Sequence, residues 1–168
     1  MSQKRAGKFC PNCGNATEQR DHAGRMRPVC PACGYVIYFD PKVAAIAFIT
    51  DDERVLLIKR GVEPGLGQWA LPGGYVEADE DPFEAAQREA LEETGLHVRV
   101  DRLLDIFYRK QDGGAITIAY AATATGGDLH AGDDAQTAQW FMRAALPQNT
   151  VFTSTRTLLR RWVSGELD

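Results

Sequence analysis

Residues 74–96 read GYVEADEDPFEAAQREALEETGL, and they contain the start and the end of one expected helix. Asp81 can cap free backbone N–H groups, Pro82 fits the first helical position, and Glu84 stands where a capping-box acid belongs. Gly95 predicts the other end, because glycine enters the left-handed cap conformation without a Cβ penalty. We therefore expect a helix between Asp81 and Gly95.

The expected helix carries acids on one face of its last two turns. Its buried stripe is predicted to consist of Phe83, Ala86 and Ala90. Successive residues turn by about 100°, so three glutamates point the same way: Glu89, Glu92 and Glu93. Like charges at this spacing cost about 0.2–0.5 kcal/mol per pair, and acids at this end oppose the helix dipole. The structural alternative is a solvated acidic face that Arg88 relieves.

The turn before the helix favours a metal site over that alternative. Gly73 and Gly74 follow Pro72, and this tight turn brings bare backbone carbonyls near the helix. Hard cations such as Mg²⁺ bind carboxylate and carbonyl oxygens together with substrate phosphates. The turn and the acidic face together predict a site for a divalent metal ion.

The same stretch matches a longer pattern, G-x5-E-x7-R-E-U-x-E-E-x-G-U, in which U is a hydrophobic residue. Every defined position is filled, from Gly74 and Glu80 to Gly95 and Leu96, although Ala90 is small for its hydrophobic position. On these residues the chain resembles the Nudix hydrolases. The resemblance implies an α/β/α sandwich with a mixed sheet. It also implies hydrolysis of a nucleoside diphosphate linked to another group, assisted by Mg²⁺ or Mn²⁺.

The resemblance further implies a ligand set for those ions. The ligands would be Glu89, Glu92, Glu93 and the backbone carbonyl of Gly73. Glu77 and Glu80 would act through water or as outer ligands. A pyrophosphate bridge repels an attacking water, so bound cations must neutralise the phosphate oxygens and acidify that water.

Catalytic roles are implied for three residues of the helix: Arg88, Glu92 and Glu93. Arg88 would orient the carboxylates. A carboxylate that is not fully engaged with metal would take the proton of the water. The choice of this base stays open among Glu92, Glu93 and a later loop acid, for which Asp134 is the first candidate and Asp133 the second.

A second pattern lies near the N-terminus, where Cys-Pro-x-Cys-Gly occurs twice. Its members are Cys10, Cys13, Cys30 and Cys33, with sixteen residues between the two pairs. This spacing suits a tetrahedral zinc site, and four thiolates leave no position for a catalytic water, so we predict a structural Zn²⁺. The alternative is disulfides. Residues 1–8 are polar and basic and lack the apolar core of a signal peptide, so we expect a reducing cytoplasm.

The second cysteine pair leads through residues 35–43 into the first expected strand. This arrangement resembles the N-terminal zinc ribbon of a Nudix subgroup that includes NADH, FAD and ADP-ribose pyrophosphatases. The Ser-Gln-Pro-Trp-Pro-Phe-Pro segment of the NADH enzymes does not occur in the chain, which favours ADP-ribose or FAD over NADH. We predict two domains, a zinc ribbon over residues 1–40 and a Nudix hydrolase domain over residues 41–168.

Length and composition are compatible with this division. The 168 residues are 44% hydrophobic, enough for one ordinary core beside a ribbon too small to fold without its metal. The net charge is −4, yet residues 1–42 contain seven basic and three acidic residues. The ribbon can therefore lend positive potential to a polyanion, whereas a pI of about 5.4 disfavours a nucleic-acid partner. We find no apolar run that predicts a membrane partner.

The rest of the chain predicts strands and loops around the helix. Strands are expected at 43–50, 55–60, 98–104, 106–110, 116–125 and 138–142, turns at 51–54 and 111–114, and an acidic glycine-rich loop at 126–134. A closing helix is expected at 152–163, with Thr153 or Ser154 as its cap. Strands and helices mixed in this way predict a mixed sheet between helices.

The predicted function is cleavage of a small-molecule nucleotide, namely ADP-ribose, FAD or a similar dinucleotide, into two monophosphates. Two alternatives stay open: a nucleoside triphosphate pyrophosphohydrolase and a non-catalytic sensor of a nucleotide or RNA. The intact carboxylate pattern argues against the sensor. A homodimer is predicted from the resemblance alone.

Substrate contacts are predicted less specifically. Aromatic side chains that can stack on a base are Trp69, Tyr75, Phe107, Tyr108 and Phe152. Arg109 and Lys110 are candidate contacts for the phosphates.

Overall fold

The computed structural model describes residues 7–110 and 114–167 of the chain. Its internal contacts divide the chain into two units, one containing the residues up to Pro41 and the other most of those from Lys42 onwards. Apart from Gly114, the turn predicted at 111–114 lies outside the described residues. No helix among the described residues is long and apolar enough to cross a membrane.

The N-terminal unit, where the zinc ribbon is predicted, is built on a two-stranded hairpin. Its strands are β1 (Glu18–His22) and β2 (Arg25–Val29), which pair antiparallel. The chain then returns beside β2, where Val29 and Val36 form an antiparallel bridge. Cys10 and Cys30 are buried, whereas most side chains of this unit are exposed. So small an interior cannot stabilise the ribbon without a further link between its two halves.

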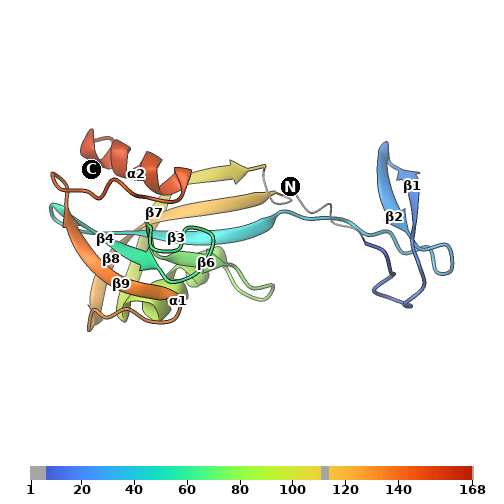
Figure 1. The fold of residues 1–168 in the computed structure, drawn as a ribbon, viewed down its shortest axis with the longest axis horizontal. Coiled ribbons are helices and arrows are strands. Elements are labelled where there is room, and N and C mark those ends of the chain that lie inside the picture. The colour runs from blue at the N-terminus through green and yellow to red at the C-terminus, as the bar shows by residue number, and fades with distance from the viewer. Residues whose placement is uncertain (1–6, 111–113, 168) are drawn as a thin grey trace. The chain divides into compact units, whose positions relative to one another are not determined.

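The second unit is the predicted α/β/α sandwich with a mixed sheet (Figure 1). Its elements are β3 (Lys42–Asp51), β4 (Arg54–Arg60), β5 (Trp69–Ala70), β6 (Gly73–Tyr75), α1 (Pro82–Thr94), β7 (Leu96–Arg109), β8 (Ala115–Gly127), β9 (Ala135–Met142) and α2 (Thr153–Val163). The strand order is β5-β4-β3-β8-β7, with β6 paired to β3 and β9 paired to β4. β3 and β4 form an antiparallel hairpin, and Trp69 makes a parallel bridge to Thr150.

Each face of the sheet is covered by one helix, as Figure 1 shows. The core on the α1 side contains Ala45, Ala47, Ile49, Ala85, Ala86 and Ala90. The core on the α2 side contains Ile46, Phe48, Leu158, Leu159 and Trp162. Successive β3 residues therefore serve opposite faces, as the period of two in a strand requires. The alanines let α1 lie close to β3, and this closeness positions its carboxylates.

α1 begins and ends where the sequence predicts. The Asp81 side chain accepts a hydrogen bond from the Phe83 amide at 2.8 Å, and Gly95 caps the other end with φ of 71°. The predicted buried stripe is wrong at Phe83, which is 41% exposed. Ala85 is buried instead, and the large Phe83 ring at the helix start lies edge-on against Tyr120.

Other predicted boundaries need correction. The two strands expected at 98–104 and 106–110 form the single strand β7, and β9 begins at Ala135. The residue at the N-cap position of α2 is Phe152, and the structure shows no side-chain cap bond. Thr153 is already helical, so its hydroxyl accepts from Arg156 Nη2 at 3.2 Å instead.

The cap of α1 can be tested directly. We expect Asp81→Ala to lower the free energy of unfolding by about 1 kcal/mol, because the Phe83 amide loses its acceptor. Urea denaturation followed by circular dichroism measures this change. Asp79→Ala, in the same acidic stretch but outside the cap, is the control and should leave stability within about 0.5 kcal/mol. Equal losses in both variants would contradict the capping role.

Candidate metal centres

The glycine turn lies directly beside the carboxylate helix. In the ladder between β3 and β6, Gly73 pairs with Ile46 and Gly74 with Ala45. A Cβ on Gly73 would collide with the Ala45 carbonyl, and one on Gly74 would collide with the Glu89 carboxylate. Gly73 also has φ of 147°, which favours glycine. The two glycines therefore allow bare backbone to approach the acids.

Arg88 organises the carboxylates. Its guanidinium donates to Glu80 at 2.8 and 3.0 Å, to Glu89 at 2.8 Å and to Glu92 at 3.0 Å. A fifth bond, of 3.1 Å, goes to the Tyr75 carbonyl. The five N–H groups of an arginine are thus all used. The bond from Arg88 also lowers the pKa of Glu80, which keeps this carboxylate ionised.

Glu93 is held differently, in the interior. Its side chain is 4% exposed and accepts a hydrogen bond from the Gly73 amide at 2.8 Å. Burial raises the pKa of Glu93 to about 8; the charges of Glu89 and Asp134 add to this rise, whereas the Gly73 amide and Arg60 oppose it. Burial also raises the pKa of Glu89. A divalent cation would offset the cost of ionising these buried acids.

The donor set fits a hard divalent cation such as Mg²⁺ or Mn²⁺. Carboxylate oxygens face a turn whose backbone is not covered by any Cβ, and both kinds of oxygen are ligands of such ions. The carboxylates nevertheless do not converge on one point, because Glu89 and Glu92 bind Arg88 and Glu93 binds the Gly73 amide. A bound cation would compete with these hydrogen bonds.

The acidic loop predicted at 126–134 wraps the end of α1. The amide of His130 donates to the Thr94 carbonyl at 3.0 Å, and that of Gly132 donates to the Glu93 carbonyl at 3.2 Å. The last carbonyls of a helix lack partners within it, so these bonds explain how α1 can end here. They also bring Asp134 close enough to raise the pKa of Glu93. The candidate loop base therefore lies near the helix carboxylates.

Two basic residues beside the site were missed by the sequence analysis. Arg60, the last residue of β4, opposes the rise in the pKa of Glu93, and its guanidinium lies 5.3 Å from the centre of the Phe152 ring. Lys42 Nζ lies 4.4 Å from the centre of the Tyr75 ring. No local sequence signal marks either pair, because their members are far apart in the chain.

The other predicted substrate contacts fall elsewhere. Trp69 and Phe107 pack against the core on the α2 side. Tyr108 and Arg109 lie at the far end of β7, about 40 Å along the strand from Leu96 at about 3.3 Å per residue, and Lys110 follows them. Arg109 and Lys110 are therefore not brought to the carboxylates, because β7 is one continuous strand that runs away from the end of α1.

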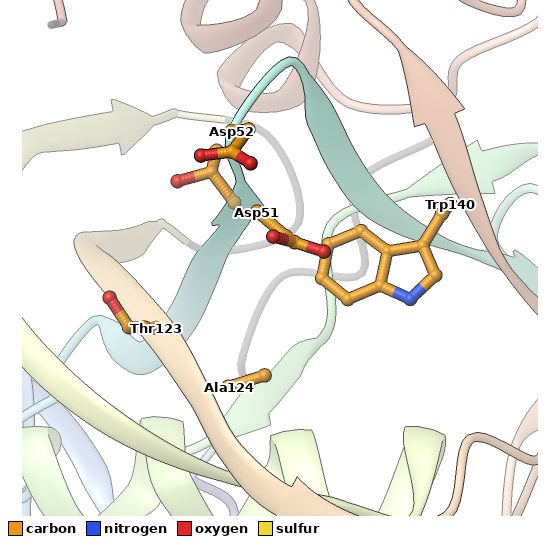
Figure 2. Close-up of a pocket in the computed structure, with 6 residues that line it drawn as sticks. Asp51, Asp52, Thr123, Ala124 and Trp140 are labelled. Carbon is orange, nitrogen blue, oxygen red and sulfur yellow. The ribbon is translucent and has the colours of Figure 1, made fainter.

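A separate open hollow of about 500 Å³ lies at the other end of β3 (Figure 2). Its lining residues are Thr50, Asp51, Asp52, Thr123, Ala124 and Trp140. It begins about four residues along β3 from Ile46, roughly 13 Å at about 3.3 Å per residue. Asp51 is already paired with Arg54. None of the predicted site residues line this hollow.

The four cysteines converge as predicted. Their sulfurs lie within 4.8 Å of one another, with Cys10–Cys33 and Cys13–Cys30 separations of 3.6 and 3.5 Å. A tetrahedral site with Zn–S bonds of about 2.3 Å places sulfurs about 3.8 Å apart, whereas a disulfide needs about 2.05 Å. The Asn15 amide donates to Cys13 Sγ at 3.4 Å and lowers the pKa of that thiol to about 6. The cluster therefore fits Zn²⁺ and not disulfides.

Family models match both units of the chain. The NUDIX domain model matches residues 40–162, and the zinc-ribbon model described as Nudix N-terminal matches residues 8–38. The chain is similar to the solved NUDIX hydrolase of Nitrosomonas europaea, with a TM-score of 0.88 and 27% identity. That alignment covers 95% of this chain and 92% of the other.

Two curated relatives indicate the range of substrates among similar proteins. An ADP-ribose pyrophosphatase of Methanocaldococcus jannaschii is 43% identical over 117 residues, which are 68% of this chain and 69% of the relative. The human 8-oxo-dGDP phosphatase NUDT18 is 34% identical over 109 residues, which are 62% of this chain but only 33% of that protein. This chain therefore spans about two thirds of the archaeal enzyme and one third of the human one.

Glu93 predicts a pH dependence of stability in the absence of divalent metal. Its folded pKa of about 8 exceeds the unfolded value of about 4.3, so the folded state keeps its proton longer. The free energy of unfolding should fall as pH rises between about 4 and 8, by at most about 1.4 kcal/mol per pH unit, and then level off. Urea denaturation at several pH values without added Mg²⁺ measures this fall.

Glu93→Gln should remove most of that fall, since the amide does not ionise. The matched control is Glu92→Gln, which changes an exposed acid of the same helix and should keep the fall. If the pH dependence of Glu93→Gln equals that of the wild type, burial of Glu93 is not its cause.

Zinc content tests the cysteine cluster. Elemental analysis should find about one zinc per chain after mild chelation that removes Mg²⁺, because four thiolates bind Zn²⁺ tightly. Cys33→Ser should lose most of it, as one of the four converging sulfurs is removed. His22→Ala is the control and should retain zinc, although His22 lies between the two cysteine pairs. Paired half-cystines in a zinc-free protein would refute the metal site.

Proposed function

This chain belongs to the Nudix family and is a hydrolase of pyrophosphate bonds, and on that basis we propose that it cleaves ADP-ribose into two monophosphates. FAD is the next candidate substrate. The observation that most directly supports hydrolysis at this centre is the five-bond network of Arg88, which holds the family's carboxylates beside the glycine turn. The 43% identity to an ADP-ribose pyrophosphatase supports the choice of substrate.

Each residue of the centre has a role in this proposal. The ligands of Mg²⁺ or Mn²⁺ are Glu89, Glu92, Glu93 and the carbonyl of Gly73. The bound cations supply charge neutralisation at the phosphates and a more acidic attacking water. Arg88 keeps the carboxylates oriented between turnovers, and Glu80, which binds Arg88, positions it. The proton of the water goes to Glu92, Glu93 or Asp134.

Two cation–π pairs would bind the substrate outside the metal centre. Tyr75 is 50% exposed beside the metal turn and carries Lys42 on its ring. Phe152 precedes α2 and carries Arg60, whose charge already acts on Glu93. A ring can stack on a base while its cation binds a phosphate, so each pair suits half of a dinucleotide.

The ribbon and the catalytic unit have different roles in the proposal. Residues 1–40 form the zinc ribbon and residues 41–168 the hydrolase domain, with structural Zn²⁺ in the first and catalytic Mg²⁺ or Mn²⁺ in the second. Cysteines that are not paired in disulfides are typical of a reducing compartment, and we propose the cytoplasm. Formation of a homodimer stays a prediction.

Activity of Glu93→Gln tests the centre. We expect this variant to lower kcat on ADP-ribose at least 100-fold, because it removes the charge of one proposed ligand. Glu84→Gln is the matched control, since it makes the same change in the first turn of the same helix and should keep kcat within about twofold. Equal activity of wild type and Glu93→Gln over a panel of ADP-ribose, FAD, NADH, diadenosine polyphosphates and nucleoside triphosphates would refute the proposal.

Products of the wild-type reaction distinguish the alternatives. Two organic monophosphates support the proposed function, whereas release of inorganic pyrophosphate from a triphosphate supports the nucleoside triphosphate pyrophosphohydrolase. Tight binding without hydrolysis in millimolar Mg²⁺ or Mn²⁺ supports the sensor.

A further inference from the structure

One face of the zinc ribbon carries an unusual row of basic side chains. Alternate residues of a strand share a face, and residues paired across an antiparallel ladder share it too. Arg20 pairs with Arg27 and His22 pairs with Arg25 in the ladder between β1 and β2. All four side chains therefore lie on the same face of the hairpin, which we call the arginine face.

Tyr38 extends this face from the returning chain. Its ring centre lies 4.8 Å from the Arg27 guanidinium carbon, and its hydroxyl lies 3.1 Å from His22 Nε2, one strand further on. Tyr38 is thus held at both its ring and its hydroxyl, by Arg27 and His22 respectively. Tyr38 is 54% exposed, so part of this fixed ring remains open to a partner.

The charges of the arginine face are poorly balanced within the ribbon. Like charges directly opposite each other in a ladder are destabilising. Glu18 lies 2.9 Å from Arg20 and forms an ion pair with it. Arg25 is exposed, and Arg27 Nε is buried without a hydrogen-bond partner among those residues. An anionic ligand would relieve this repulsion.

We propose that the arginine face binds single-stranded polynucleotide. Arginines provide planar donors for phosphates, and an exposed aromatic ring provides a stacking surface for an unpaired base. A phosphate-rich membrane surface or a duplex would use the arginines but would leave Tyr38 without a base to stack on. The acidic pI of the chain disfavours such a partner only as an average, because the acids lie mainly outside the ribbon.

None of the residues of the arginine face belongs to the proposed catalytic centre. All residues of the arginine face lie in the ribbon. Hydrolysis of a small nucleotide does not explain why the ribbon carries these basic side chains.

Fluorescence anisotropy of full-length, zinc-loaded protein with a 5′-labelled 12-nucleotide oligouridylate tests the proposal. We expect saturable binding that weakens as salt rises from 50 to 200 mM, because phosphate contacts release counterions. Arg25→Gln should weaken binding at least threefold and Tyr38→Ala at least fivefold. Tyr38→Phe keeps the ring and should stay within twofold of the wild type.

The matched control is Arg99→Gln, an exposed arginine of β7 that pairs with Asp101 outside the ribbon, and it should not change the affinity. Zinc content and the far-UV circular dichroism spectrum should be the same in all variants, which would show that they are folded. The proposal is overturned if the wild type does not bind, or if Tyr38→Ala binds as the wild type does. It is also overturned if a duplex of the same length or vesicles containing phosphatidylserine bind as tightly.

Discussion

The hydrogen bonds of Arg88 are the constraint on which the catalytic unit depends. Four carboxylates gather at one end of α1, and three of them, Glu80, Glu89 and Glu92, share this one guanidinium. Without Arg88 these carboxylates would lose the cation that offsets their mutual repulsion. The alanines of α1 and the glycines of β6 matter because they bring backbone and helix close enough for this network to form.

Glu93 is a carboxylate of the same centre whose ionisation is unfavourable in the folded protein. It lies outside the Arg88 network and is buried, and its charge is stabilised by the Gly73 amide and by the charge of Arg60. Its raised pKa means that the folded protein resists ionising it. A cation that bound the ionised form would recover this cost, so in the proposed centre burial of Glu93 would couple metal binding to proton release. Perturbed acids of this kind are typical of functional sites.

Local chemistry determined which parts could be predicted from the sequence. The cap at Asp81, the stop at Gly95 and the four cysteines depend on residue types at short spacing, and the structure confirms these positions. Arg60 and Lys42 could not be identified, because their aromatic partners are distant in the chain and meet them only through the sheet. Phe83 was wrongly predicted to be buried for a related reason. Helical spacing indicates which side of the helix a residue is on, but not whether the sheet reaches far enough to cover it.

The uneven distribution of charge follows from the chemistry of the two units. Residues 1–42 have a net charge of +4 and the remainder −8. An acidic centre attracts divalent cations but repels a polyanionic substrate until those cations are bound. The arginine face has the opposite preference, since its positive charge attracts phosphates and repels cations. The two sets of charges belong to different units of the chain. The average charge of the chain therefore describes neither surface.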